Sequence, residues 1–265
     1  MSDNGISNPL RMNGNALTRR KLLSGAALGA GGLLSGCDAL NKSPAFRGVL
    51  ESAEGANMAL HRSLGERMAL AREFTEADLS RSFRGNGNRD IDTPEYQAMV
   101  AGDFASWRME IKGLVNTPLS LSLDQIRAMP QRAQITRHDC VEGWSAIGKW
   151  TGVPLKLLLD QAGLQDSAKY IVFRCADDFS GTPYYESIDL VDAYHPQTII
   201  AHQLNDESLP VKNGAPLRLR VERQLGYKHA KFITAIEAVE SLASIGKGKG
   251  GYWEDSNNYE WYAGI

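Results

Sequence analysis

Cysteine is scarce in this sequence. Its 265 residues include three, Cys37, Cys140 and Cys175. Three cysteines cannot form a disulfide framework. The sequence has no CxxC pair of the kind that structural zinc sites use, and no CxxCH motif for covalent haem attachment. A disulfide-stabilised scaffold is therefore excluded, and a cysteine-rich zinc module or a c-type cytochrome is disfavoured.

Long apolar runs and an excess of positive charge are also missing. The apolar stretch 22–36 is too short and too rich in glycine to cross a membrane, which takes roughly 20 strongly apolar residues. The formal net charge is −2, and residues 1–37 hold four basic residues and one acidic residue, so 25 basic and 30 acidic residues follow them. Binding to nucleic acid needs clustered Lys and Arg, so this balance argues against a nucleic-acid partner.

The N-terminal segment 1–37 has the features of an export signal. Paired arginines, Arg19 and Arg20, precede about fifteen small or apolar residues, and this arrangement resembles a twin-arginine signal. The sequence LSGC, which ends at Cys37, resembles a lipobox whose cysteine is acylated; an ordinary cleaved signal is the alternative. Asp38 would then favour retention at the inner membrane. We expect a periplasmic protein that is exported already folded, with its cofactor inserted in the cytoplasm.

The rest of the chain is predicted to form a tether, a short helix and one domain. Residues 38–56 are interpreted as the tether, 57–73 as an amphipathic helix and 74–265 as the domain, in which no internal repeat occurs. Many short strands with few helices indicate an α+β fold with a mixed sheet. The predicted strands are 107–115, 170–176, 197–204 and 217–222, and a helix is predicted at 153–163, with Pro154 in its first turn and Gly163 at its end.

Cys140 lies in an unusual neighbourhood of charged, aromatic and glycine residues. The simplest interpretation of a lone cysteine is a buried structural thiol. Arg137 and His138 would instead lower the pKa of the thiol, and the thiolate is the form that binds metals. Glu142 is predicted to lie on the same side of an extended segment, where it could supply a proton or a carboxylate. A zinc site, or a cysteine nucleophile with a base from one of the histidines His195, His202 and His229, remains open at this point.

Two motifs resemble one known family. The segment RHDCVEGWSAIGKWTGVPL (137–155) resembles the molybdenum-ligand segment of the sulfite oxidase family, the oxidoreductase molybdopterin-binding domain. Within that family it is most similar to bacterial periplasmic methionine sulfoxide reductase catalytic subunits. The second motif, 201–240, has the family's strand, its Gly-Ala-Pro-Leu-Arg turn and its Gly-Tyr-Lys loop. The resemblance runs from about Phe83 to the last residue. The family's immunoglobulin-like dimerisation domain is absent, which predicts a monomer.

The resemblance implies a role for individual residues. Cys140 matches the molybdenum ligand, beside two sulfurs from the dithiolene of the pterin, and Glu142 matches a catalytic position. The residues that match cofactor-binding positions are Asn86, Cys175, Asn213, Arg218, His229, Ala230 and Lys231; Asn86 is a weaker match, and Cys175 replaces the usual small hydroxyl residue. Alternatives remain for several of them. Arg218 and Arg220 could form a solvated strand face, Lys231 could be a surface lysine, and Cys140 could pair with Cys175 in a disulfide.

The resemblance also implies a reaction. Molybdenum cycling between Mo(VI) and Mo(IV) transfers an oxygen atom, while electrons pass to or from a separate carrier, implied to be a membrane cytochrome b. An S-oxide or N-oxide is the favoured substrate, because the extra arginine of the sulfite-oxidising branch is missing shortly after Cys140. The alternatives are a sulfite-oxidising enzyme, a metal-free periplasmic binding module and a zinc hydrolase.

Overall fold

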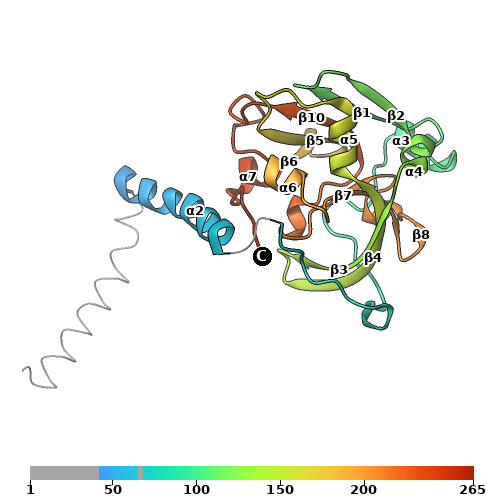
Figure 1. Cartoon of the computed structure of the whole chain (residues 1–265), viewed down its shortest axis with the longest axis horizontal. Coiled ribbons are helices and arrows are strands. Elements are labelled where there is room, and N and C mark those ends of the chain that lie inside the picture. The colour runs from blue at the N-terminus through green and yellow to red at the C-terminus, as the bar shows by residue number, and fades with distance from the viewer. Residues whose placement is uncertain (1–41, 65–67) are drawn as a thin grey trace, which may run out of the picture. The chain divides into compact units, whose positions relative to one another are not determined.

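The computed structural model describes residues 42–64 and 68–265, and Figure 1 shows how their elements follow one another. The export-signal interpretation of Arg19, Arg20 and Cys37 concerns residues outside this described part. The chain divides into two compact units, residues 1–56 and 57–265. A search of the described residues finds no helix that is both long and apolar enough to cross a membrane.

Helix α2 (Pro44–Leu64) occupies much of the segment where a tether followed by a short helix is expected. Residues 44–56, predicted as part of the tether, are helical, and the helix ends at Leu64, before position 73. Its start follows from local chemistry, because the Phe46 N–H donates to Ser43 Oγ at 3.4 Å. Pro44 takes the first helical position, where a missing N–H costs nothing. This cap sets the start of the helix, which the apolar spacing does not reveal.

Two five-stranded sheets organise residues 57–265 (Figure 1). One sheet has the order β2-β1-β10-β5-β6, with β1 and β10 parallel and the other neighbours antiparallel. The other has the order β3-β4-β7-β8, with β9 paired to β7, and is antiparallel throughout. The predicted α+β class with a mixed sheet is confirmed. The strands are β1 (Arg108–Gly113), β2 (Leu119–Ser122), β3 (Arg132–Cys140), β4 (Trp144–Pro154), β5 (Tyr170–Phe179), β6 (Thr182–Asp189), β7 (Ile199–Leu204), β8 (Glu207–Ser208), β9 (Arg218–Arg220) and β10 (Ile233–Val239).

Short helices connect and cover these strands. They are α3 (Pro94–Ala101), α4 (Leu123–Ala128), α5 (Leu155–Ala162), α6 (Leu190–Ala193) and α7 (Tyr252–Asn257), with 3-10 turns η1 (Glu76–Asp78), η2 (Val211–Asn213) and η3 (Gly226–Lys228). Helix α5 is the one predicted from the sequence. Gly163 ends it with a φ of 68°, and Leu155 and Leu158 are fully buried in the main apolar core with Met109 of β1. The four predicted strands correspond to β1, β5, β7 and β9.

The β3–β4 hairpin positions Cys140. This residue ends β3 and pairs with Trp144, the first residue of β4. Between them Gly143 has a φ of 85°, and its N–H donates to Cys140 O at 3.0 Å. Glycine adopts this left-handed conformation without the steric cost that a side chain adds. Glu142 therefore lies in a turn, and the expectation that it shares an extended segment with Cys140 is wrong.

Candidate active site

A pocket lies at the end of the β3–β4 hairpin. It encloses about 640 Å³ of empty space, part of it open to solvent. Its lining comes from segments that are far apart in the sequence and meet here. Five of the predicted site residues line it: Asn86, Cys140, Glu142, His229 and Lys231. The other lining residues are Gly87, Asn88, Val141, Asp177, Phe179, Tyr184, Gly226, Tyr227, Trp253 and Tyr259.

Cys140 is a buried, free thiol. Burial raises the pKa of the thiol above its usual value, so the expectation that Arg137 and His138 lower it is wrong. Arg137 points to solvent and pairs with Asp139 at 2.9 Å. The cation that does lower the pKa of the Cys140 thiol is Arg218, a smaller effect than burial. A protonated thiol in a pocket becomes a thiolate when it binds a metal.

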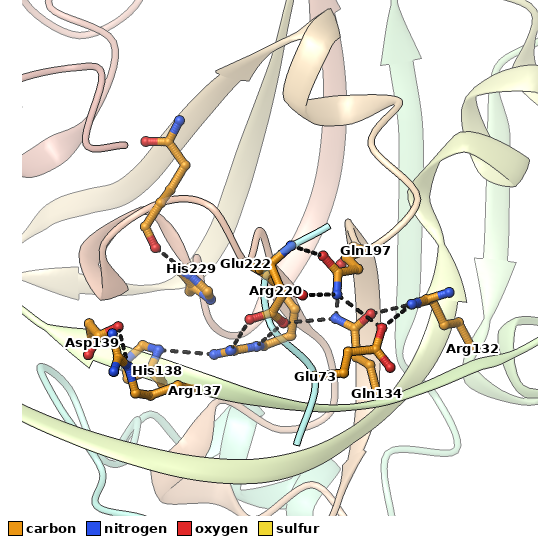
Figure 2. Close-up of polar contacts among 12 residues, drawn as sticks. Glu73, Arg132, Gln134, Arg137, His138, Asp139, Gln197, Arg220, Glu222 and His229 are labelled. Atoms are coloured by element: carbon orange, nitrogen blue, oxygen red, sulfur yellow. Dashed lines mark hydrogen bonds and ion pairs between the residues drawn. The ribbon is translucent and has the colours of Figure 1, made fainter. Parts of the chain in front are cut away.

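His138 stays neutral. Its side chain is 1% exposed, and burial next to the charge of Arg218 holds the pKa of His138 well below its usual value. Its Nδ1 lies 2.9 Å from Arg220 Nη1, and Figure 2 shows the two side chains pointing toward one another. The His138 and His229 rings meet edge to face, 5.0 Å between centroids.

Glu142 lies close to Cys140 despite its different backbone conformation. Its Oε2 accepts a hydrogen bond from Trp144 Nε1 at 2.9 Å, and its charge raises the pKa of the Cys140 thiol. Both residues line the pocket. The turn therefore presents a thiol and a carboxylate to the same space, which is the juxtaposition that the sequence interpretation requires.

Arg218 is fully buried, so the solvated-face alternative is wrong for it. Its Nη1 donates to Asn213 O at 3.1 Å, whereas its Nε and Nη2 have no hydrogen-bond partner in the described part of the chain. Burial and the neighbouring charge of Arg220 lower the pKa of Arg218 to about 9. Asn213 is also fully buried; its Nδ2 donates to Arg84 O at 3.1 Å, and its Oδ1 lacks a partner among the described residues. Unsatisfied buried polar groups at this density require an explanation.

Arg220 is equally buried, and the solvated-face interpretation is wrong for it as well. It forms an ion pair with Glu222 at 2.5 Å, and both side chains are 0% exposed. Figure 2 shows how this pair continues through Gln134, which donates to Glu222 Oε1 at 2.8 Å, toward Glu73 near the surface. Glu222 balances the charge of Arg220, so Arg218 is left as a buried cation available to an anion.

The loop after η3 carries the other predicted cofactor residues. His229 is buried, its Nε2 lies 3.1 Å from Gln224 O, and burial holds its pKa well below the usual value. Ala230 is fully buried, and its carbonyl accepts from the Leu219 N–H at 2.8 Å. Lys231 is 7% exposed, so the surface-lysine alternative is wrong. Its Nζ donates to Asn86 O at 2.6 Å, and burial lowers the pKa of Lys231 to about 7.

Glycine allows two loops of the site to meet. A Cβ on Gly214 would lie 2.6 Å from Lys231 Cβ, and Gly214 has a φ of 107°. The Gly214 carbonyl accepts from the Phe232 N–H at 3.1 Å. The turn that carries Asn213 and the loop that carries Lys231 therefore run in contact, because no side chain separates them.

Cys175 does not line the pocket. It is a partly buried free thiol on β5, and burial next to Asp177 raises its pKa well above the usual value. A disulfide between Cys140 and Cys175 is therefore wrong, since both thiols are free. Lys231, which does line the pocket, lowers the pKa of the Cys175 thiol, an effect smaller than that of burial.

The zinc and nucleophile alternatives find little support. No group of three or more His, Cys, Asp or Glu side chains within residues 42–64 and 68–265 is arranged to hold a metal ion. His195 and His202 do not line the Cys140 pocket and contact Ala69 O and Gln131 Oε1, each at 3.0 Å. The third histidine considered, His229, shares the pocket with Cys140.

The aromatic side of the pocket is not predicted from the sequence. Phe179, Tyr184, Tyr227, Trp253 and Tyr259 all line it, together with Asp177. The one signal in the sequence is the density of aromatic residues in YWEDSNNYEWY (252–262). Nothing in that spacing indicates which rings face a cavity, because three separate segments supply them.

Comparison with known proteins identifies the same family that the two sequence motifs resemble. Residues 96–244 match the model of the oxidoreductase molybdopterin binding domain. A relative from Azospira oryzae, named "Putative protein-methionine-sulfoxide reductase subunit YedZ1", is 39% identical over 89% of this chain and 84% of its own length. The protein-methionine-sulfoxide reductase catalytic subunit MsrP of Xanthomonas campestris is 32% identical over 84% of this chain and 70% of its own.

Among solved structures, the sulfane dehydrogenase SoxCD from Paracoccus pantotrophus covers 52% of this chain and 39% of its own, with a TM-score of 0.47 and 21% identity. The family recognised from the two sequence motifs is confirmed by the family match and by the relatives. The chain belongs to the oxidoreductase molybdopterin-binding domain family and is an enzyme that transfers oxygen atoms.

Proposed function

We propose that the enzyme reduces small S-oxides, methionine sulfoxide in particular, at a molybdenum ion bound by Cys140. The observation that carries this proposal is the placement of a free, buried thiol in a pocket next to a buried and only partly paired arginine, Arg218. The names of the two relatives support the choice of substrate.

The residues around Cys140 suit an anionic, hydrogen-bonding heterocycle. Arg218 offers two unpartnered N–H groups, and the Asn213 and Asn86 side chains each offer an unpartnered carbonyl oxygen within the described residues. Arginine is well matched to phosphate, since its charge is permanent and its donors are fixed in a fork. A pterin cofactor bound there would supply two dithiolene sulfurs and a metal that exchanges two electrons.

The chain's own residues then have distinct roles. Cys140 would hold the metal through its sulfur, and Arg218 with Asn213 would hold the anionic and polar edges of the pterin. Lys231 lines the pocket, and its pKa of about 7 lets it hold or release a proton near neutral pH. Glu142, which lines the same pocket as Cys140, can accept a hydrogen bond from a protonated group there.

The electrostatics of the pocket favour a neutral substrate over sulfite. Its lining includes the carboxylates of Glu142 and Asp177. The cationic side chain in the lining is Lys231, whose Nζ is held by the carbonyls of Asn86 and Asn88. With Arg218 engaged by the anionic pterin, a second anion entering this space would meet like charges and little free positive charge. A sulfoxide carries no net charge and avoids that repulsion.

The overall reaction consumes electrons and protons. The S–O bond breaks, the sulfoxide sulfur is reduced to a thioether, and the oxygen leaves as water after taking up two electrons and two protons. We propose that the electrons come from a haem-containing carrier in the membrane. The export features around Arg19 and Arg20 support a periplasmic location, with anchoring at Cys37.

Expression in a host that makes the molybdenum cofactor tests the proposal. We expect about one molybdenum and one pterin per chain, and reduction of methionine sulfoxide by reduced viologen. Sulfite oxidation with ferricyanide serves as the competing assay. Stoichiometric zinc in place of molybdenum, or activity toward sulfite alone, would contradict the proposal.

The location needs its own experiment. Replacing both Arg19 and Arg20 by Lys keeps the charge but removes the pair that the twin-arginine export machinery reads, so the protein should accumulate in the cytoplasm. Cell fractionation followed by immunoblotting measures this. An undiminished periplasmic yield of the double variant would show that export uses another route.

A further inference from the structure

Part of the pocket lining comes from the C-terminal segment, beyond the family match. The matched residues end at 244, whereas Trp253 and Tyr259 of the C-terminal segment line the same pocket as Cys140. Asn86, Gly87 and Asn88, which precede the matched residues, line the pocket as well, so it is shared between the matched domain and segments on both sides of it.

The aromatic rings of the pocket lining form a continuous wall. Trp253 and Tyr259 are nearly parallel, at 27°, with centroids 5.9 Å apart. Phe179 of β5 contacts Trp253 at 5.0 Å, and Tyr227 contacts Tyr259 at the same centroid distance. Trp253 and Tyr259 are only partly buried, so ring surface remains open to the pocket. Aromatic surface in a cleft binds apolar groups and sulfur.

The wall is held in place by buried polar contacts. Helix α7 has only six residues, too few to be stable alone. Glu254, between the wall residues, is fully buried and pairs with Lys228 of η3 at 2.8 Å. The next residue, Asp255, accepts a hydrogen bond from Tyr185 OH at 2.6 Å. Lys228 also pairs with Glu186 of β6, so α7 is fastened both to the sheet and to the loop that precedes His229.

The charges and the aromatic rings of the pocket together define the class of substrate that it can bind. The carboxylates of Glu142 and Asp177 disfavour anions, and the rings of Trp253 and Tyr259 favour apolar substituents next to a polarisable sulfur. An S-oxide with a long, flexible alkyl arm can contact both rings while its oxygen points toward Cys140. Dimethyl sulfoxide has the same S–O bond but too little apolar surface to reach the wall.

We propose that Trp253 and Tyr259 are the specificity-determining residues of this enzyme and bind the alkyl arm of a methionine-type sulfoxide. This inference rests on the proposed function, since it assigns the substrate contacts of that same site. It separates the pocket into a cofactor side, built by the loops around Cys140, and a substrate side, built by the C-terminal segment.

The test compares two substrates in one variant. In Trp253→Ala holoenzyme, kcat/KM for methionine sulfoxide should fall about tenfold, the size expected when about two methylene groups of the alkyl arm are no longer buried, at about 0.8 kcal/mol each. The value for dimethyl sulfoxide should change less than about threefold. The loss for methionine sulfoxide should appear in KM rather than kcat. Tyr259→Ser should act in the same direction, which covers the case in which Trp253→Ala does not fold.

Matched controls and a binding measurement make the result decisive. Trp253→Phe keeps a ring and should retain most of the affinity. Molybdenum and pterin content should match the wild type in every variant. Calorimetric titration of the oxidised holoenzyme with methionine sulfoxide gives Kd without turnover.

The possible results distinguish the assignment of Trp253 and Tyr259 from the proposed S-oxide reduction. Equal losses for both substrates, or unchanged Kd in Trp253→Ala and Tyr259→Ser, would overturn the assignment of the wall while S-oxide reduction by the wild type stands. A wild-type holoenzyme that neither binds nor reduces either sulfoxide would overturn the proposed function, and the wall assignment with it.

Discussion

Arg220 determines the tautomer of His138. A guanidinium can only donate, so the 2.9 Å contact between Arg220 Nη1 and His138 Nδ1 makes Nδ1 an acceptor and leaves the ring proton on Nε2. Burial and the nearby guanidinium groups of Arg218 and Arg220 hold the pKa of His138 well below its usual value. A neutral imidazole two residues before Cys140 is therefore part of the folded structure at neutral pH.

The ion pair that orients His138 has a testable energetic consequence. Arg220→Met should destabilise the protein by about 3–5 kcal/mol, because it leaves Glu222 as a buried carboxylate without its partner. Urea unfolding of the holoenzyme measures this loss. Arg220→Met combined with Glu222→Gln removes the unpaired charge and should recover part of the stability. If the double variant is no more stable than the single one, charge pairing is not what keeps Arg220 in place.

His202 links stability to acid pH. Burial near Arg127 lowers the pKa of His202 to about 4, from a usual value of about 6.5. The unfolded chain therefore takes up this proton before the folded protein does, and the stability contributed by neutral His202 is lost as pH falls from about 6.5 to about 4.

His202→Gln isolates this effect. The variant lacks the titrating group, so the difference in Tm between wild type and variant should shrink, or reverse in favour of the variant, as pH is lowered through this window. The raised pKa of Glu186 acts with the opposite sign but is common to both proteins. A difference in Tm that is constant from pH 7 to pH 4.5 would contradict the assignment.

Replacing Cys140 by Ala should separate cofactor binding from catalysis. The side chains that would hold the pterin are those of Arg218, Asn213 and Asn86, which have polar atoms without a hydrogen-bond partner among the described residues. Cys140 would contact only the metal. The pterin content, measured by the fluorescence of the oxidised pterin, should therefore remain close to one per chain. The Mo(V) magnetic resonance spectrum should change, and sulfoxide reduction should be abolished. Wild-type spectrum and activity in Cys140→Ala would identify Cys140 as a structural thiol.

Arg218→Ala should weaken retention of the cofactor. A hydrogen bond to a charged group contributes about 1.5–3 kcal/mol, so affinity for the pterin should fall by at least about tenfold. Pterin per chain after extended gel filtration measures the loss. Arg137→Ala is the matched control, because Arg137 precedes Cys140 in sequence but its side chain is 56% exposed. Equal cofactor content in both variants would show that Arg218 does not hold the pterin.

The sequence by itself determined the family, the α+β class and helix α5, and it singled out Cys140 as the candidate metal ligand. These depend on local signals: the Pro154 and Gly163 boundaries of a helix, short apolar strands, and two motifs whose order and spacing are rare by chance. The predicted residues Asn86, Cys140, Glu142, His229 and Lys231 do meet in one pocket. Their roles there remain predictions.

Only the tertiary structure decided which charges are buried, which rings face the pocket and in which direction the Cys140 pKa shifts. Arg218 and Arg220 alternate along the chain like residues of a solvated strand, yet both are buried because β9 pairs with β7 inside the protein. Arg137 adjoins the Cys140 segment but points to solvent, and distant Arg218 is the cation that acts on the thiol. Burial and electrostatics depend on which distant segments are packed together, and sequence neighbours do not reveal that packing.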